Sequence, residues 1–237
     1  MEESASLENK DIRAIIFDID GTLVDTFEVY QKVFNMGIAQ YGVAPATQEV
    51  LRDNLAKGLN LRQILQNVFP WPIDDETYAR CRTDILNRFK EAEVGEVKPF
   101  SGTEELFDHL QHKGIKIGIA TGRTSSCEDE WVRFTRLGLD KYISAIVTSK
   151  EIQNRKPAPD VIIECARRLD VPTATCIAIG DTVSDILAAK RAGSLAAAVT
   201  TGHEDEDILL KECPDFLFHS VGDLAFYLEQ NLLNSRS

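Results

Sequence analysis

The sequence lacks a long hydrophobic run, a targeting signal and a paired set of cysteines. Its longest apolar stretches, such as residues 14–17 and 195–199, are far shorter than the roughly 20 residues that a membrane span needs. The first residues are acidic and polar, so no secretory or organellar signal is expected. The five cysteines are scattered along 237 residues, which is typical of reduced thiols. These absences predict a cytoplasmic protein that does not bind membranes.

Positive charge is also scarce. The chain has 26 lysines and arginines against 38 acidic residues, which gives a net charge of −12. A chain this acidic binds polyphosphate backbones poorly, so no nucleic-acid partner is expected. The hydrophobic content of 43% and charged content of 27% are typical of a globular protein of this length with an ordinary core.

Six short apolar segments predict buried β-strands. They are rich in Ile, Val and Ala without alternation, as expected for a sheet covered on both faces. Amphipathic helical segments separate them, so we expect an α/β fold with a doubly wound, Rossmann-like parallel sheet. The predicted strands are residues 12–17, 115–120, 143–148, 175–179, 195–199 and 216–218. The predicted helices of this part are residues 102–112, 127–138, 159–170, 183–192, 204–213 and 221–231.

The interval between the first two predicted strands is close to a hundred residues long. A strand–helix–strand unit needs only about 30 residues or slightly more. Most of the interval has helical periodicity, over residues 27–40, 47–54, 61–67 and 74–93. We therefore predict an α/β core domain of residues 1–26 and 99–237, with an all-helical domain of residues 27–98 inserted into it. The assembly is expected to be a monomer or a homodimer.

Two acids leave the first predicted strand together, Asp18 and Asp20, and Gly21 allows a sharp turn after them. In a doubly wound sheet, ligands bind at the carboxyl ends of the strands. Two neighbouring carboxylates need a hard cation, or they divide into one ionised and one protonated group. Taken alone, the same residues could also form an ordinary acidic turn.

Three further polar features follow predicted strands. Thr121 and Gly122 offer a hydroxyl and backbone N–H groups that suit phosphate oxygens. Lys156 precedes a proline-rich turn that would hold it in place. Asp181 and Asp185 are spaced to share one face of a helix. Each feature alone also fits a structural role: a turn, a solvated lysine or a helix cap.

The order acid pair, threonine, lysine, acid pair resembles the motif order of the haloacid dehalogenase-like (HAD) hydrolase superfamily. The resemblance covers residues 11–26 and 99–225. The inserted helices are similar to the helical cap of the branch that contains phosphoglycolate phosphatases, β-phosphoglucomutases and phosphonatases. This resemblance implies a HAD-like core domain and a helical cap domain that opens and closes over it.

The resemblance also implies catalytic roles. Asp18 matches the nucleophile that forms an aspartyl-phosphate, and Asp20 matches the general acid and base. Thr121 and Gly122 match the group that holds the phosphoryl oxygens, and Lys156 matches the lysine that neutralises charge beside the nucleophile.

A Mg²⁺ cofactor is implied at the same place. Its ligands would be the Asp18 carboxylate, the Asp20 main-chain carbonyl and Asp181. Asp185 would either reach the metal through water or brace the lysine, and the sequence leaves both possibilities open.

Substrate contacts are expected from basic residues around the pocket. Lys57, Gly58 and Arg62 match the position of the cap's specificity loop, and Arg123 follows the threonine motif. These residues could meet an anionic group of the substrate, or they could form a solvated basic connection.

The predicted function is that of a Mg²⁺-dependent, phosphoglycolate phosphatase-like enzyme acting on a small phosphorylated metabolite. Asp20 disfavours a dehalogenase, because dehalogenases of this superfamily lack the second acid. A phosphomutase, a phosphonate hydrolase and a catalytically silent phospho-ligand binding protein remain as alternatives.

Overall fold

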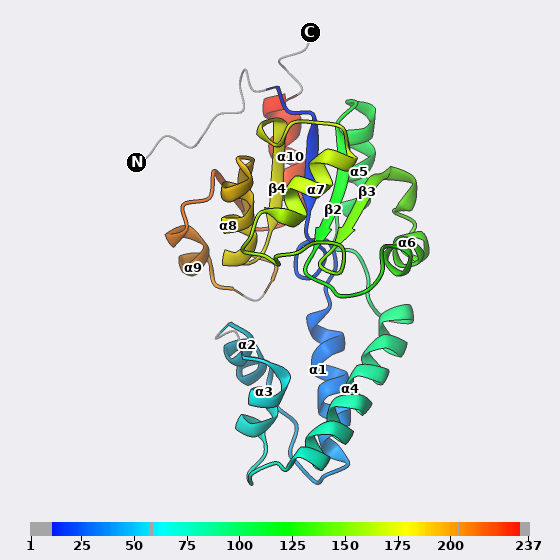
Figure 1. The fold of residues 1–237 in the computed structure, drawn as a ribbon, viewed down its shortest axis with the longest axis vertical. Helices are drawn as coiled ribbons and strands as arrows, with labels where there is room; N and C mark the ends of the chain where they lie inside the picture. Colours follow the sequence, from blue (N-terminus) through cyan, green and yellow to red (C-terminus); the bar gives the residue numbers. More distant parts are fainter. Residues whose placement is uncertain (1–10, 57–58, 203, 233–237) are drawn as a thin grey trace. The chain divides into compact units, whose positions relative to one another are not determined.

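The computed structural model describes residues 11–56, 59–202 and 204–232, which form two compact units (Figure 1). One unit contains the described residues up to Val24 and from Pro99 onward, and the other spans Asp25–Lys98. Among the described helices, none combines the length and the apolar character that a membrane span requires.

A six-stranded parallel sheet forms the centre of the first unit, in the order β3-β2-β1-β4-β5-β6. The doubly wound α/β fold predicted from the sequence is therefore confirmed. Phe17 at the end of β1 lies opposite Ile119 and Ile179, so three strands end close to the same edge. The strands are β1 Ala14–Phe17, β2 Lys116–Thr121, β3 Ile143–Thr148, β4 Cys176–Gly180, β5 Leu195–Val199 and β6 Phe216–Phe218.

Helices cover both faces of this sheet. Successive residues of β1 point to opposite faces, and all four are buried, so both faces must be covered. Ile16 joins the core cluster that contains residues of α7 and α8. Phe17 packs on the other side against Phe107 of α5, with ring centroids 5.3 Å apart. The helices of this unit are α5 Thr103–His112, α6 Cys127–Arg136, α7 Asp160–Arg168, α8 Val183–Ala192, α9 Glu206–Lys211 and α10 Val221–Leu232. Two short 3₁₀ turns are η1 Asp140–Tyr142 and η2 Thr173–Thr175.

A tight turn follows β1. The carbonyl of Ile19 accepts the amide N–H groups of residues 22, 23 and 24, and Gly21 adopts a left-handed φ of 76°. Val24 then bridges to Pro99, where the chain returns to this unit. The turn ends the strand abruptly and leaves Asp18 and Asp20 at the carboxyl edge of the sheet.

The second unit consists of helices α1 Phe27–Ala39, α2 Gln48–Ala56, α3 Leu61–Val68 and α4 Asp75–Gly95. The ring of Tyr30 in α1 contacts two other rings. Its centroid lies 5.9 Å from that of Phe34 in the same helix and 6.5 Å from that of Phe89 in α4. Burial raises the pKa of Tyr30 to about 12. The capping box of Asn60 and Gln63 fixes the start of α3.

Candidate active site

Four segments that follow adjacent strands meet in one pocket of about 430 Å³ in the first unit. The segments come from the ends of β1, β2, β3 and β4, which lie side by side in the sheet. Carboxyl ends of parallel strands form the usual ligand-binding edge of such a fold. The pocket is lined by Asp18, Asp20, Thr121, Gly122, Arg123, Arg155, Lys156, Asp181, Thr182, Ser184 and Asp185.

Lys156 links two of the predicted acids. Its ammonium nitrogen lies 2.7 Å from Asp18 Oδ1, 2.6 Å from Asp185 Oδ1 and 2.7 Å from the carbonyl oxygen of Ala120. These three acceptors use all three N–H donors of the lysine. Because the side chain is only 8% exposed, its direction is fixed toward Asp18.

The charges in this cluster perturb one another. Burial raises the pKa of Asp18 to about 7; Lys156 opposes this rise, while Asp185 and Asp20 add to it. Burial alone would lower the pKa of Lys156, but Asp18 and Asp185 outweigh it and hold the pKa above its ordinary value. The single positive charge of Lys156 cannot neutralise both Asp18 and Asp185, so the pocket favours a further cation.

Asp181 lies deeper in the same pocket. Its Oδ1 accepts a hydrogen bond of 3.0 Å from the hydroxyl of Thr22. Its Oδ2 is buried, and the described residues provide no hydrogen-bond partner for it. Burial, with added repulsion from Asp185 and Asp18, raises the pKa of Asp181 well above the ordinary carboxyl value. A buried carboxylate oxygen in this state has the chemistry of a ligand for a hard cation.

Two glycines make room for this carboxylate. A Cβ atom on Gly21 would lie 2.4 Å from Asp181 Oδ2, and one on Gly202 would lie 1.7 Å from the same oxygen. Thr201 holds the second glycine's loop in place, because its hydroxyl donates to the carbonyl of Gly21 at 2.6 Å. The backbone is therefore shaped around the oxygen that lacks a hydrogen bond.

Asp185 has two structural partners. Its Oδ2 accepts hydrogen bonds from the main-chain N–H and the hydroxyl of Thr182, which completes a capping box at the start of α8. Its Oδ1 faces Lys156. The main-chain N–H of Val183 donates to Glu204 Oε2 at 2.6 Å, so this helix start is fixed from a second loop. In this geometry Asp185 caps the helix and braces the lysine.

Asp20 is held by Arg123. The Nε and Nη2 atoms of the guanidinium lie 2.6 and 2.5 Å from the two carboxylate oxygens, which is a bidentate ion pair. The main-chain N–H of Arg123 donates to Thr121 Oγ1 at 3.2 Å. Since that hydroxyl oxygen already accepts a bond, its hydrogen remains to donate elsewhere.

Three residues of the inserted helical segment, Lys57, Gly58 and Arg62, were predicted to contact the substrate. Lys57 and Gly58 are outside the described residues. Arg62 makes a 2.5 Å ion pair with Asp75, and its guanidinium lies 4.8 Å from the ring centre of Tyr78. Its contact with substrate stays a prediction.

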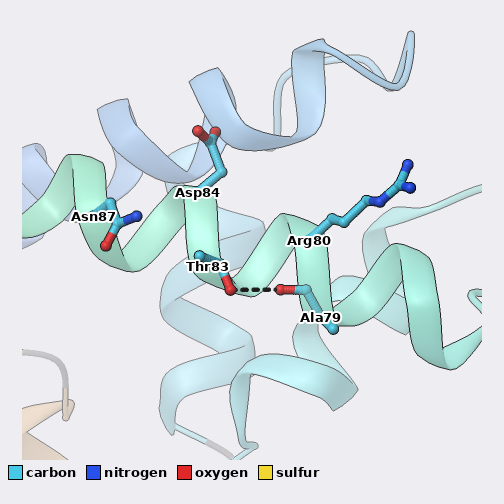
Figure 2. Close-up of a pocket in the computed structure, with 5 residues that line it drawn as sticks. All are labelled: Ala79, Arg80, Thr83, Asp84 and Asn87. Atoms are coloured by element: carbon cyan, nitrogen blue, oxygen red, sulfur yellow. Dashed lines mark hydrogen bonds between the residues drawn. The ribbon is translucent and has the colours of Figure 1, made fainter.

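A second pocket, of about 420 Å³, lies on α4 in the other unit (Figure 2). Its carboxylate, Asp84, accepts hydrogen bonds from Gln40 and Arg88. The hydroxyl of Thr83 donates to the carbonyl of Ala79, as the dashed line in Figure 2 shows. Asp84 is the one carboxylate in the lining of this pocket, so the pocket lacks the cluster of acids found in the first.

Several positioning residues were missed by reasoning from the sequence. They act through main-chain contacts or through loops distant in the chain, which a linear pattern does not reveal. Among them, only Thr22 could have been found from the sequence, because it directly follows Gly21 in the first motif. The missed residues are Thr22, Ser149, Thr201, Gly202 and Glu204.

The implied Mg²⁺ would need hard oxygen donors close to Asp18. The described residues contain no cluster of three or more His, Cys, Asp or Glu side chains arranged to hold a metal ion. The predicted ligand set is of another kind, because it combines two carboxylates with a main-chain carbonyl. The buried, unbonded Oδ2 of Asp181 and the excess of carboxylates around Lys156 fit such a cation.

Comparison with protein families agrees with this geometry. The family model of haloacid dehalogenase-like hydrolases matches residues 15–199. The chain belongs to this family. Among curated relatives, phosphoglycolate phosphatase of Escherichia coli K12 is 26% identical over 235 residues, covering 91% of this chain and 92% of the relative. Phosphoglycolate phosphatase of Neisseria meningitidis is 25% identical, covering 93% and 94%.

Solved structures of the family share the fold. A predicted phosphoglycolate phosphatase from Haemophilus somnus matches with a TM-score of 0.77 at 18% identity, covering 91% of this chain and 97% of that one. A candidate β-phosphoglucomutase from Thermotoga maritima matches with a TM-score of 0.76 at 25% identity, covering 92% and 99%. The predicted family and enzyme class, a HAD-like hydrolase with phosphatase relatives, are confirmed.

Proposed function

We propose that this enzyme is a Mg²⁺-dependent phosphatase that hydrolyses a small phosphorylated metabolite through an aspartyl-phosphate on Asp18. The observation that carries the proposal is the Asp18–Lys156–Asp185 network, which faces Asp20 and the Thr121 hydroxyl in one pocket. The phosphoglycolate phosphatases among its relatives support this reaction class.

The first step transfers the phosphoryl group to Asp18. A carboxylate oxygen of Asp18 attacks phosphorus, the bond from phosphorus to the ester oxygen breaks, and the leaving oxygen takes a proton from Asp20. Lys156 keeps Asp18 in position and offsets negative charge, while Thr121 donates its hydroxyl hydrogen to a phosphoryl oxygen. Asp20 must leave its ion pair with Arg123 before it can act.

The second step releases phosphate. Asp20, now a carboxylate, takes a proton from water, whose oxygen attacks phosphorus. The bond between phosphorus and Asp18 then breaks, which restores the Asp18 carboxylate and yields inorganic phosphate.

Mg²⁺ would be held by the Asp18 carboxylate, the Asp20 carbonyl and Asp181, where it would offset the negative charge of the phosphoryl group and the acids. The buried Oδ2 of Asp181 supports this assignment. The five unpaired cysteines agree with the predicted reducing, cytoplasmic location.

Phosphate release from a panel of phosphomonoesters tests the proposal. The panel contains phosphoglycolate, sugar phosphates, nucleotides and an aryl phosphate, each with Mg²⁺ and with a chelator. We expect release in Mg²⁺ that falls at least about tenfold with chelator and returns when Mg²⁺ is added back. Absence of release from every compound would contradict the proposal, and phosphorylation of Asp18 without release would favour a mutase.

Gly202→Ala should weaken metal binding. The new Cβ would overlap Asp181 Oδ2, so the carboxylate must move. Since residues that orient metal ligands typically affect affinity by about 10- to 100-fold, we expect a shift of that size in the Mg²⁺ titration of activity. Gly95→Ala is the matched control, because a Cβ there meets nothing within 4 Å. An unchanged titration in the Gly202 variant would remove Asp181 from the ligand set.

A further inference from the structure

Arg123 lies inside the pocket, and its guanidinium is bound to an acid that the proposed reaction needs. Its side chain is 14% exposed and that of Asp20 is 33% exposed. Both carboxylate oxygens of Asp20 accept from this one guanidinium. A carboxylate bound in this way faces the arginine and cannot direct a proton toward a leaving group.

The main chain of Arg123 is firmly anchored. Its carbonyl accepts the N–H and the hydroxyl of Ser149, at 3.0 and 2.8 Å. Two residues later, the hydroxyl of Ser125 donates to the fully buried Glu130, which also pairs with Arg133. The backbone of this loop is thus fixed at both ends, and the guanidinium is the part that can change its partner.

The partner that Arg123 now holds is itself a carboxylate. Arginine's planar fork matches two coplanar anionic oxygens, whichever molecule carries them. A substrate carboxylate close to the phosphate ester can therefore take the place of Asp20 on the same two N–H groups. The exchange would release Asp20 only when such a substrate is present.

We propose that Arg123 determines substrate specificity by exchanging Asp20 for a carboxylate of the substrate, which selects phosphomonoesters that carry a nearby carboxylate. This inference rests on the phosphatase function proposed above. It assigns to one residue both recognition of the leaving group and release of the general acid. Arg155 is the other arginine that lines the pocket, and it is the competing candidate for the same anion.

The experiment compares phosphoglycolate with glycolamide phosphate, which has the same size without the negative carboxylate. The kcat/KM ratio of the two compounds is measured for the wild type, Arg123→Met, Arg123→Lys, Arg155→Met and Arg136→Met. Arg136 is exposed on the last turn of α6, outside the pocket, and is the matched control. We expect the wild type to prefer phosphoglycolate by about 10- to 100-fold, as charge-assisted hydrogen bonds allow.

In Arg123→Met the ratio should fall at least about tenfold, and Arg123→Lys should recover part of it. In Arg155→Met and Arg136→Met the ratio should stay near the wild-type value. An equal loss on both compounds in Arg123→Met would overturn the inference, since it would indicate a role in positioning alone. A collapse of the ratio in Arg155→Met would also overturn it.

Failure of the inference and failure of the proposed function give different results. If the wild type hydrolyses both compounds equally, the specificity role of Arg123 is wrong while the phosphatase reaction stands. If the wild type hydrolyses neither these compounds nor any other phosphomonoester, the proposed function fails and the inference falls with it. Binding of glycolate alone, measured by calorimetry on the wild type and Arg123→Met, adds a readout without turnover: weaker binding to the variant supports the exchange, and equal binding contradicts it.

Discussion

Asp18→Asn should reduce phosphate release by at least about 10⁴-fold, because an amide oxygen is a far weaker nucleophile than a carboxylate. The fold should survive the change. An amide oxygen can still accept the hydrogen bond from Lys156, which keeps Asp185 as its second carboxylate partner. Burial already raises the pKa of Asp18 to about 7, so a neutral side chain suits this position.

The measurement is single-turnover phosphate release, with mass spectrometry of the protein during the reaction. The wild type should carry one phosphoryl group on Asp18, and the variant should carry none. Asp170→Asn is the matched control, since Asp170 is exposed and its left-handed φ of 55° suits asparagine. A variant that keeps a tenth of the wild-type rate, with no deamidation of the introduced asparagine, would rule out Asp18 as the nucleophile.

Lys156→Met should reduce activity by about 10²- to 10³-fold and also destabilise the protein. The ammonium group offsets charge beside the nucleophile, and loss of one such donor typically has an effect of this size. Removing one partner of a buried ion pair costs about 3–5 kcal/mol, because the remaining charges stay buried without compensation. The deficit in stability should shrink as the pH falls below about 7, because burial raises the pKa of Asp18 to about 7 and a protonated Asp18 no longer needs the lysine.

Chemical unfolding at several pH values measures this effect. Lys150→Met is the matched control, because Lys150 is an exposed lysine in the same loop. A variant as stable as the wild type at neutral pH would show that the ion pairs of Lys156 contribute nothing net to folding. A variant with full activity would remove Lys156 from the mechanism.

The sheet was predictable because its strands are short apolar runs separated by amphipathic helices. The predicted segments 143–148, 195–199 and 216–218 coincide with β3, β5 and β6. The predicted helix at 204–213 is shorter in the structure, where α9 spans Glu206–Lys211. Glu204 instead accepts a hydrogen bond from the first residue of α8, Val183. Such a contact between distant parts of the chain cannot be predicted from the hydrophobic pattern of the sequence.

The meeting of the site residues could also be expected, because the carboxyl ends of adjacent parallel strands share one edge. Which of these side chains form ion pairs with one another could not be predicted. The sequence left Asp185 open between a water-mediated metal contact and a brace for the lysine, and only the loop after β3 decides which groups lie near it. Arg123 was expected to meet substrate, yet here it binds Asp20, because β1 and β2 are neighbours in the sheet.

The central position of β1 has a consequence for synthesis of the protein. This strand is made first, but its neighbours β2 and β4 begin at Lys116 and Cys176. At about 5–20 residues per second, its apolar residues wait roughly 8–32 s for the second neighbour. The helical unit of Asp25–Lys98 is complete well before then. A ribosome-bound chain is therefore expected to expose the apolar residues of β1 after the helical unit has already been synthesised, which makes this strand a candidate for chaperone binding.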